Sequence, residues 1–174
     1  MVTIGRKLTR RGSVVKSEKD AYRLLKEHFS GMFAVHHTRL ENWAGTGVPD
    51  VNWCFSVQGE GVEVWTELKF MKGFQFRSEL KAAQAIWLRN RWLAGGRAYL
   101  LAVQPPNTFL LWEGHKASRL RDADSPLNVP TDGVYTGEYA ELALDMLNHQ
   151  PPIVHRISID SSADSKAETL FWVS

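Results

Sequence analysis

Two strand-like segments separated by a glycine-containing turn are the clearest pattern in the sequence. Residues 51–57 (VNWCFSV) and 62–69 (VEVWTELK) are rich in β-branched and aromatic side chains, and residues 58–61 (QGEG) between them favour a turn. This pattern predicts a β-hairpin. If Gly59-Glu60 form a two-residue loop, Gln58 pairs with Gly61, and a longer loop would shift that register.

Counting outward from this turn predicts which side chains meet across the hairpin. Asp50 falls opposite Lys69 and diagonal to Glu67. Directly opposed Cβ atoms lie about 5 Å apart and diagonal ones about 7 Å apart, which is close enough for two carboxylates to share an ion. Because side chains alternate along a strand, Glu67 and Lys69 share one face with Glu63 and Trp65. The other face is expected to be core, and it carries Val62, Val64, Thr66 and Leu68.

Helical and strand patterns on either side of the hairpin predict an α/β fold. Ser17 is expected to cap a helix over residues 18–29 that ends at Ser30-Gly31, and residues 33–40 alternate as a first strand. After the hairpin, Ser78 is expected to cap a helix that ends near Leu93. Its predicted core-facing residues are Leu80, Ala83, Ile86, Trp87 and Leu93.

The strands that follow complete a mixed sheet. Residues 98–103 (AYLLAV) form a continuous apolar run, which is typical of a strand buried on both faces, and the strand–helix–strand order makes it a parallel neighbour of residues 62–69. Residues 108–112 are expected to form an edge strand, and residues 138–148 a possible helix. The predicted order is αβββαβ with a mixed central sheet flanked by helices.

Two carboxylates and a lysine at such spacing suit a divalent-metal site. Hard carboxylate ligands favour Mg²⁺ or Mn²⁺, which keep several waters and accept phosphate oxygens, so a phosphodiester is the natural substrate. In such a site Lys69 would orient the attacking water or stabilise the developing negative charge. Since the pattern is short, an ordinary surface cluster of Asp50, Glu67 and Lys69 across a hairpin is the alternative.

The wider pattern resembles the PD-(D/E)xK nuclease superfamily, and within it the VRR-NUC branch with its small stand-alone phage and bacterial members. The resemblance covers roughly residues 17–103 and includes residues 45–50 (GTGVPD), residues 65–69 (WTELK), and Gln84, Trp87 and Leu88 ahead of Gly95-Gly96. It implies a restriction-endonuclease-like core. It also implies that Asp50 and Glu67 bind the metal, that the Leu68 carbonyl is a further ligand, and that Lys69 completes the site.

The resemblance implies two further site residues, one on each helix. The family uses a glutamine on the helix after the strand that carries Glu67-Leu68-Lys69, and this corresponds to Gln84. It also uses an acid on the first helix. Glu18 is the expected metal ligand from this helix, with Asp20 and Glu27 as rivals. The first-turn acids Glu18 and Asp20 are equally explained by the helix dipole, and Gln84 by a structural role.

Length and composition predict one soluble domain with appendages. The 174 residues divide into a basic arm (1–16), a nuclease core (17–113) and a C-terminal extension packed on the core (114–174). No long apolar run and no signal peptide are apparent, so we expect a cytoplasmic protein without membrane association. The single cysteine, Cys54, is expected to be buried within a strand, and it excludes disulfides within the chain and iron–sulfur clusters ligated by several cysteines.

Charge distribution adds candidate nucleic-acid contacts. Net charge is only +2, but the arm carries Arg6, Lys7, Arg10, Arg11 and Lys16 without an acid, which suits either a phosphate-tracking segment or a solvated tail. Further candidates for phosphate contacts are Arg39, Lys72 and Arg77. Phe74 and Phe76 lie between Lys72 and Arg77 in the sequence, and they can stack on bases or pack locally.

The predicted function is a metal-dependent deoxyribonuclease, an endonuclease selective for branched or junction DNA. The resemblance further implies a homodimer, since single-domain relatives often act as homodimers. Two alternatives stay open: a sequence-specific or nicking endonuclease of the same superfamily, and a non-catalytic nucleic-acid-binding protein that retains the fold.

Overall fold

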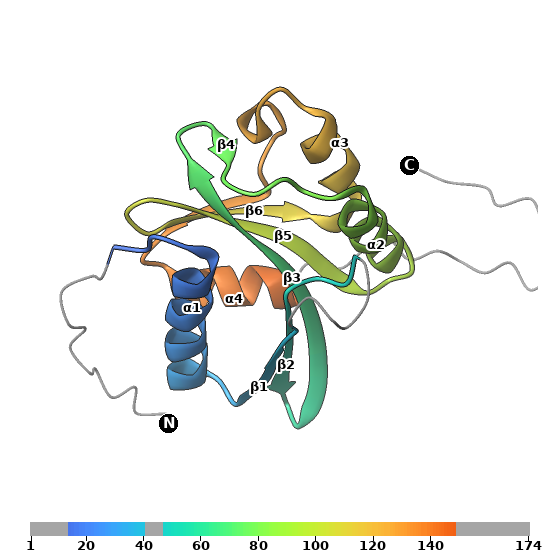
Figure 1. The fold of residues 1–174 in the computed structure, drawn as a ribbon. Coiled ribbons are helices and arrows are strands. Elements are labelled where there is room, and N and C mark those ends of the chain that lie inside the picture. Colours follow the sequence, from blue (N-terminus) through green and yellow to red (C-terminus); the bar gives the residue numbers. More distant parts are fainter. Residues whose placement is uncertain (1–13, 41–46, 149–174) are drawn as a thin grey trace, which may run out of the picture.

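The computed structural model describes residues 14–40 and 47–148, in which one sheet is covered by helices on both faces (Figure 1). Strands lie in the order β1-β2-β3-β5-β6-β7, and β4 pairs with β3 beyond this path. Among the described strands, only β3 and β5 are parallel neighbours, so the sheet is mixed. The strands are β1 (Val35–Arg39), β2 (Val51–Val57), β3 (Glu60–Lys72), β4 (Gln75–Phe76), β5 (Arg97–Gln104), β6 (Thr108–Glu113) and β7 (Gly133–Thr136).

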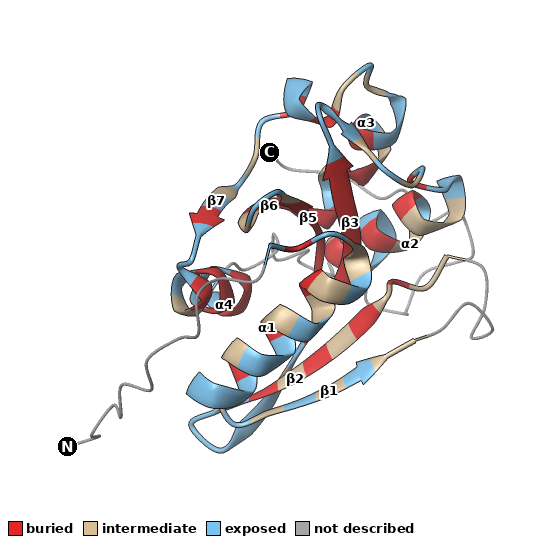
Figure 2. Ribbon diagram, turned by 60° about the vertical axis from the view of Figure 1, so that its left-hand side comes forward, coloured by how far each residue is buried: buried red, intermediate tan, exposed pale blue. Residues whose placement is uncertain are grey.

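Two apolar cores hold the layers together. Helices α1 (Glu18–Met32) and α4 (Tyr139–Asn148) cover one face, where Leu25 and Phe29 pack with Trp53 of β2. Helices α2 (Ala82–Leu93) and α3 (Ala117–Asp122) cover the other face, together with the short helical turn η1 (Gly114–Lys116). A second turn, η2 (Pro126–Asn128), follows α3. Figure 2 shows how the buried residues concentrate on β3 and β5 between these layers. The predicted α/β class with a mixed sheet is confirmed.

Helix α1 begins where the sequence predicts and ends later. Ser17 is its N-cap and accepts a hydrogen bond from the Asp20 backbone N–H at 3.1 Å. The predicted end at Ser30-Gly31 is wrong, because the helix continues through both residues to Met32. A single glycine costs a helix only about 1 kcal/mol, which continued backbone hydrogen bonding can offset.

The hairpin between β2 and β3 has a different register from the predicted one. Val57 pairs with Glu60, so the two-residue loop is Gln58-Gly59 rather than Gly59-Glu60. Both loop residues have positive φ, 53° and 87°, which is the type I′ geometry that matches the twist of the flanking strands. The register is therefore shifted by two residues, and its continuation places Asp50 opposite Glu67 rather than Lys69. Because a shift of two preserves side-chain alternation, the predicted faces of β3 hold.

Helix α2 begins later than predicted, and its predicted core-facing set is right only in part, since Leu80 is buried and Trp87 and Leu93 pack against the core. Ser78 is not its cap; Lys81 is the N-cap residue, and the helix starts at Ala82. Its buried residues are Ala85, Leu88 and Trp92. Of the predicted core-facing set, Leu80 is buried ahead of the helix and Ile86 is 53% exposed, while Ala83, Trp87 and Leu93 are half-buried. Which side chains a helix buries depends on how the helix is rotated about its axis against the sheet. Tertiary contacts decide that rotation.

The last strands extend the sheet beyond the predicted edge. The parallel pairing of β3 with β5 is confirmed. Strand β6, expected at the edge, instead pairs on its outer side with β7, and α4 packs beneath them. Cys54 is half-buried rather than buried, because its face of β2 is only partly covered. Across the two described ranges, no helix combines the length and the apolar character needed to cross a membrane.

Candidate metal centre

The candidate centre lies at the start of β2, where part of β3 has no neighbouring strand on the β2 side. The first pair of this ladder is Val51 with Thr66, so the edge of β3 beyond Thr66 is uncovered on the β2 side. Asp50 bonds to that edge: its Oδ2 accepts a hydrogen bond from the Leu68 backbone N–H at 3.0 Å. The N–H and C=O of one strand residue point to the same edge, so the Leu68 carbonyl faces the side on which Asp50 lies.

The turn before Asp50 is fixed against α2. Gly47 has a φ of 99°, a region that side chains with a Cβ rarely adopt. A Cβ on Gly47 would also lie 2.6 Å from the carbonyl oxygen of Ala83. This close approach holds the Pro49-Asp50 segment next to the first turn of α2, which also carries Gln84.

Glu67 is the most unusual residue of the centre, because its carboxyl is buried with one oxygen unsatisfied. Its solvent exposure is 0%. Oε1 accepts a hydrogen bond from Gln84 Nε2 at 2.6 Å and lies 3.0 Å from Lys69 Nζ. Oε2 is also buried, and it has no hydrogen-bond partner among the described residues. A buried carboxylate oxygen without a partner costs free energy unless something else binds it.

Burial and neighbouring acids disfavour the charged form of both carboxyl groups. Burial, and then the negative charge of Asp50, raise the pKa of Glu67 from 4.5 to about 7, although Lys69 acts in the opposite direction. Burial also raises the pKa of Asp50, which the Leu68 N–H and Lys69 partly offset. Acids with pKa values raised by burial and by a like charge concentrate at functional sites, which makes Asp50 and Glu67 candidates for one.

Lys69 links the centre to α1 through Ser78. Its ammonium group is 5% exposed and lies 3.3 Å from the Glu79 carbonyl oxygen and 3.5 Å from Ser78 Oγ. Ser78 Oγ in turn donates a hydrogen bond to Glu18 Oε1 at 2.6 Å. The chain of contacts therefore runs Glu18–Ser78–Lys69–Glu67–Gln84. Sequence reasoning missed Ser78, which it assigned to a helix cap, and no local signal marks its actual role.

Among the acids of α1, Glu18 is the one that reaches the centre. Its charge contributes to the raised pKa values of Asp50 and Glu67. The rivals do not reach it: Asp20 bonds Ser17 and pairs with Arg23, and Glu27 is exposed on the helix surface.

Of the predicted basic residues that the structure describes, Arg39 is the one whose charge acts on the centre. Arg39 is half-buried with its guanidinium 5.3 Å from the centre of the Tyr22 ring, and its charge lowers the pKa of Asp50, so it lies near the centre. Lys72 and Arg77 are exposed, and Arg77 donates to the Lys16 carbonyl oxygen at 3.2 Å. The arm residues Arg6, Lys7, Arg10 and Arg11 lie outside the described residues.

The donors present fit a hard divalent cation with open positions. In the parts of the chain that the structure describes, no three His, Cys, Asp or Glu side chains form a closed metal-binding group. The available set is the carboxylates of Asp50 and Glu67 with the Leu68 carbonyl. Oxygen donors and few protein ligands are what Mg²⁺ and Mn²⁺ require, since these ions retain water. The unsatisfied Glu67 Oε2 is the specific atom that such an ion would satisfy.

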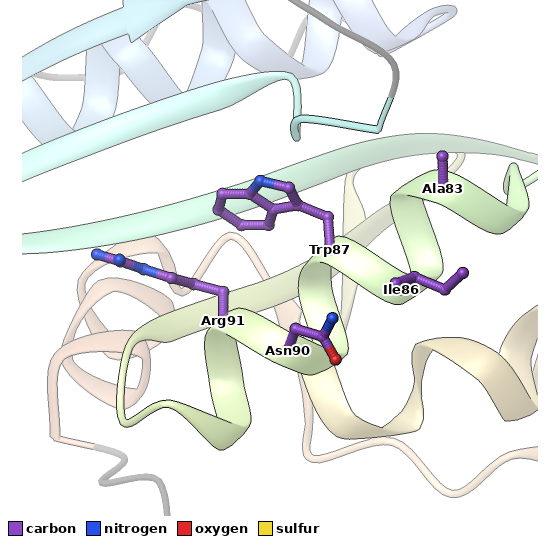
Figure 3. A pocket seen from close by; sticks show the side chains of 5 residues that line it. All are labelled: Ala83, Ile86, Trp87, Asn90 and Arg91. Carbon is purple, nitrogen blue, oxygen red and sulfur yellow. The ribbon is translucent and has the colours of Figure 1, made fainter.

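An open hollow of about 600 Å³ borders the centre along the outer side of α2 (Figure 3). Its lining residues are Ala83, Ile86, Trp87, Asn90 and Arg91. Ala83, at one end, adjoins Gln84, and Trp87 packs on Trp65 of β3 with ring centroids 5.2 Å apart. The chemical groups of the centre do not line this hollow, so it is a neighbouring surface rather than the site itself.

Comparison with known proteins assigns no family to this chain. A scan against protein-family models found no match, and a search of curated proteins found none either. What the centre does has to be inferred from its own residues and contacts.

Proposed function

We propose that the protein is a divalent-metal-dependent endonuclease that hydrolyses DNA phosphodiester bonds and selects branched or junction DNA. One observation carries the proposal: Glu67 is fully buried beside Asp50 and Lys69, and its Oε2 has no hydrogen-bond partner among the described residues. Burying an acid beside a second acid is costly, and a structural role alone does not require it. The resemblance of this region to PD-(D/E)xK nucleases supports the same reading.

Asp50, Glu67 and the Leu68 carbonyl would hold a Mg²⁺ or Mn²⁺ ion. When bound, such an ion polarises the scissile phosphate and lowers the pKa of a bound water. Asp50 is oriented for this role by the Leu68 N–H, and Glu67 by Gln84, since each of these bonds occupies one carboxylate oxygen and leaves the other. Glu18 would act through Ser78, by fixing the hydroxyl that lies near Lys69.

Lys69 would supply the fixed positive charge of the reaction. Its ammonium is held by the Glu79 carbonyl and by Glu67, so it cannot swing into solvent. In that position it would orient the attacking water and stabilise the negative charge that develops on the phosphate. Gln84 would keep Glu67 in its rotamer, which makes it a positioning residue. Arg39, Lys72 and Arg77 would bind phosphates flanking the scissile bond.

The test compares the wild type with Glu67→Gln and Lys69→Ala on a four-way junction, a linear duplex, single strands and an RNA duplex, with Mg²⁺, Mn²⁺ or EDTA. The matched control is Glu63→Gln, on the same face of β3 but exposed and loosely paired with Arg91 at 3.7 Å. We expect metal-dependent cleavage by the wild type and the control, with loss of at least about 100-fold in both site variants.

Cleavage that survives EDTA, or that both site variants retain, would refute the mechanism. Binding of DNA without cleavage in any metal would favour the non-catalytic alternative. Equal cleavage of junction and linear duplex would remove the structure selectivity while leaving the nuclease itself in place.

A further inference from the structure

The hairpin formed by β3 and β4 presents a phenylalanine to solvent at the end of the strand that carries Glu67 and Lys69. Met71 pairs with Phe76 and Lys72 with Gln75, so Gly73-Phe74 is the two-residue loop at the tip. Gly73 has a φ of 63°, as a type II′ turn requires at its first position. Phe74 is 72% exposed, which makes it the most exposed large apolar side chain in the described ranges; the next, Val134, is 55% exposed.

The backbone of this tip is braced, although its aromatic ring is not. Ser125 Oγ donates a hydrogen bond to the Phe74 carbonyl oxygen at 2.7 Å, and Gln75 Nε2 donates to the Asp124 carbonyl oxygen. Below the tip, Phe76 packs against Trp112 with ring centroids 6.2 Å apart. The two phenylalanines therefore differ: Phe76 is part of the core, whereas Phe74 is held out from it on a supported loop. Packing within the described residues does not explain an exposed aromatic ring on a braced backbone.

The residues around Phe74 are charged rather than apolar, and they include cations as well as the exposed acid Asp124, whose carbonyl accepts from Gln75. Lys72 and Arg77 on the two arms are exposed, and no ion pair within the described residues involves either of them. Lys16 is exposed next to Arg77, to which its carbonyl is bonded. Arg77 also lies over the Phe70 ring, 6.0 Å from its centre. An exposed aromatic ring between strands that carry exposed cations can stack on a base while the cations neutralise adjacent phosphates.

We propose that Phe74 stacks on an unpaired base where a DNA duplex opens, and that this contact sets the preference for branched DNA. This inference rests on the proposed nuclease function, because β3 connects the tip directly to Glu67 and Lys69. Strands rise about 3.3 Å per residue, so the tip lies about 10–17 Å from Lys69. At about 3.4 Å per nucleotide, that is about three to five nucleotides along one strand. Cleavage is therefore expected about three to five nucleotides from the branch point.

The experiment measures binding separately from cleavage. Wild type, Phe74→Ala, Phe74→Trp and the control Val134→Ala are titrated in EDTA onto a splayed-arm duplex and an unbroken duplex of the same sequence. The splayed arm carries 2-aminopurine at the first unpaired position, so that stacking quenches its fluorescence. Stacking on one base typically contributes a factor of about 5 to 150 in affinity.

We expect Phe74→Ala to bind the splayed duplex about 5- to 150-fold more weakly and to lose the quenching. Its affinity for the unbroken duplex should change little, and Phe74→Trp and Val134→Ala should behave as wild type does. Undiminished quenching in Phe74→Ala, or equal losses on both duplexes, would overturn the inference.

The binding assay also separates this inference from the nuclease proposal. If Phe74→Ala binds and cleaves the splayed duplex as wild type does, stacking is wrong and the nuclease stands. If no variant cleaves but quenching still depends on Phe74, the nuclease is wrong and stacking stands. If wild type binds neither duplex, both are wrong.

Discussion

Replacing Glu67 by glutamine should stabilise the metal-free protein above pH 7 while abolishing its response to metal. Glutamine has the shape of the protonated glutamic acid, and its carbonyl can accept the hydrogen bond that Gln84 donates. It lacks the charge that is buried beside Asp50. The substitution therefore separates the cost of the buried charge from the packing of the side chain.

The size of the effect follows from the pKa of Glu67. The folded protein raises this pKa from 4.5 to about 7, so the folded state binds the proton more tightly than the unfolded state does. The contribution of Glu67 to the stability of the metal-free protein is then fully present below about pH 4.5, and it is lost as the pH rises through 7. At about 1.36 kcal/mol per pKa unit, the loss is about 3 kcal/mol. Glu67→Gln should avoid this loss and exceed wild-type stability by about 3 kcal/mol at pH 8.

Urea unfolding in EDTA at pH 5, 6, 7 and 8 measures this difference directly. Adding Mg²⁺ at about 100 times its dissociation constant should stabilise the wild type by about 2.7 kcal/mol and Glu67→Gln much less. The control, Glu63→Gln, removes an exposed acid from the same strand and should change stability by at most about 0.5 kcal/mol at any pH.

The reasoning is refuted if wild-type stability in EDTA does not fall between pH 5 and pH 8. It is equally refuted if Glu67→Gln is less stable than wild type at pH 8. The attraction between Lys69 and the charged Glu67 would then outweigh the cost of burying that charge. A variant that retains the full response to Mg²⁺ would remove Glu67 from the ligand set.

Three other substitutions test the support of the centre. Gly47→Ala should destabilise the protein by about 1–3 kcal/mol in a thermal or urea melt, because its φ is positive and a Cβ would meet the Ala83 carbonyl; an unchanged melt would contradict that close approach. Gln84→Ala should weaken Mg²⁺ binding measured by calorimetry by about 10-fold, since Glu67 loses its orienting bond, and equal affinity would exclude a positioning role. Trp53→Phe leaves the buried Thr66 hydroxyl without its donor at 2.9 Å and should cost about 1–3 kcal/mol in urea unfolding, with no change in metal affinity.

Much of the local structure could be predicted because it depends on neighbouring residues. The bounds of β2 match the predicted segment, since a run of β-branched and aromatic residues between turn signals favours a strand wherever it packs. Ser17 caps α1 through a bond to a residue three positions along. Alternation along β3 placed Glu67 and Lys69 on one face, which holds in any pairing register. Because the register error was two residues, Asp50 also stays on that face.

What the sequence by itself determined is which residues form strands and helices, and that two acids and a lysine have the spacing to converge. Tertiary structure decided the contacts that make them a centre: the exposed edge of β3 that Asp50 covers, the bond from Gln84 to Glu67, and the route from Glu18 through Ser78 to Lys69. The core residues of α2 that sequence reasoning missed and the wrong cap at Ser78 belong to this second group. The physical reason is that propensity and alternation act over a few residues, whereas these contacts join segments up to 60 residues apart, and only packing of the layers brings them together.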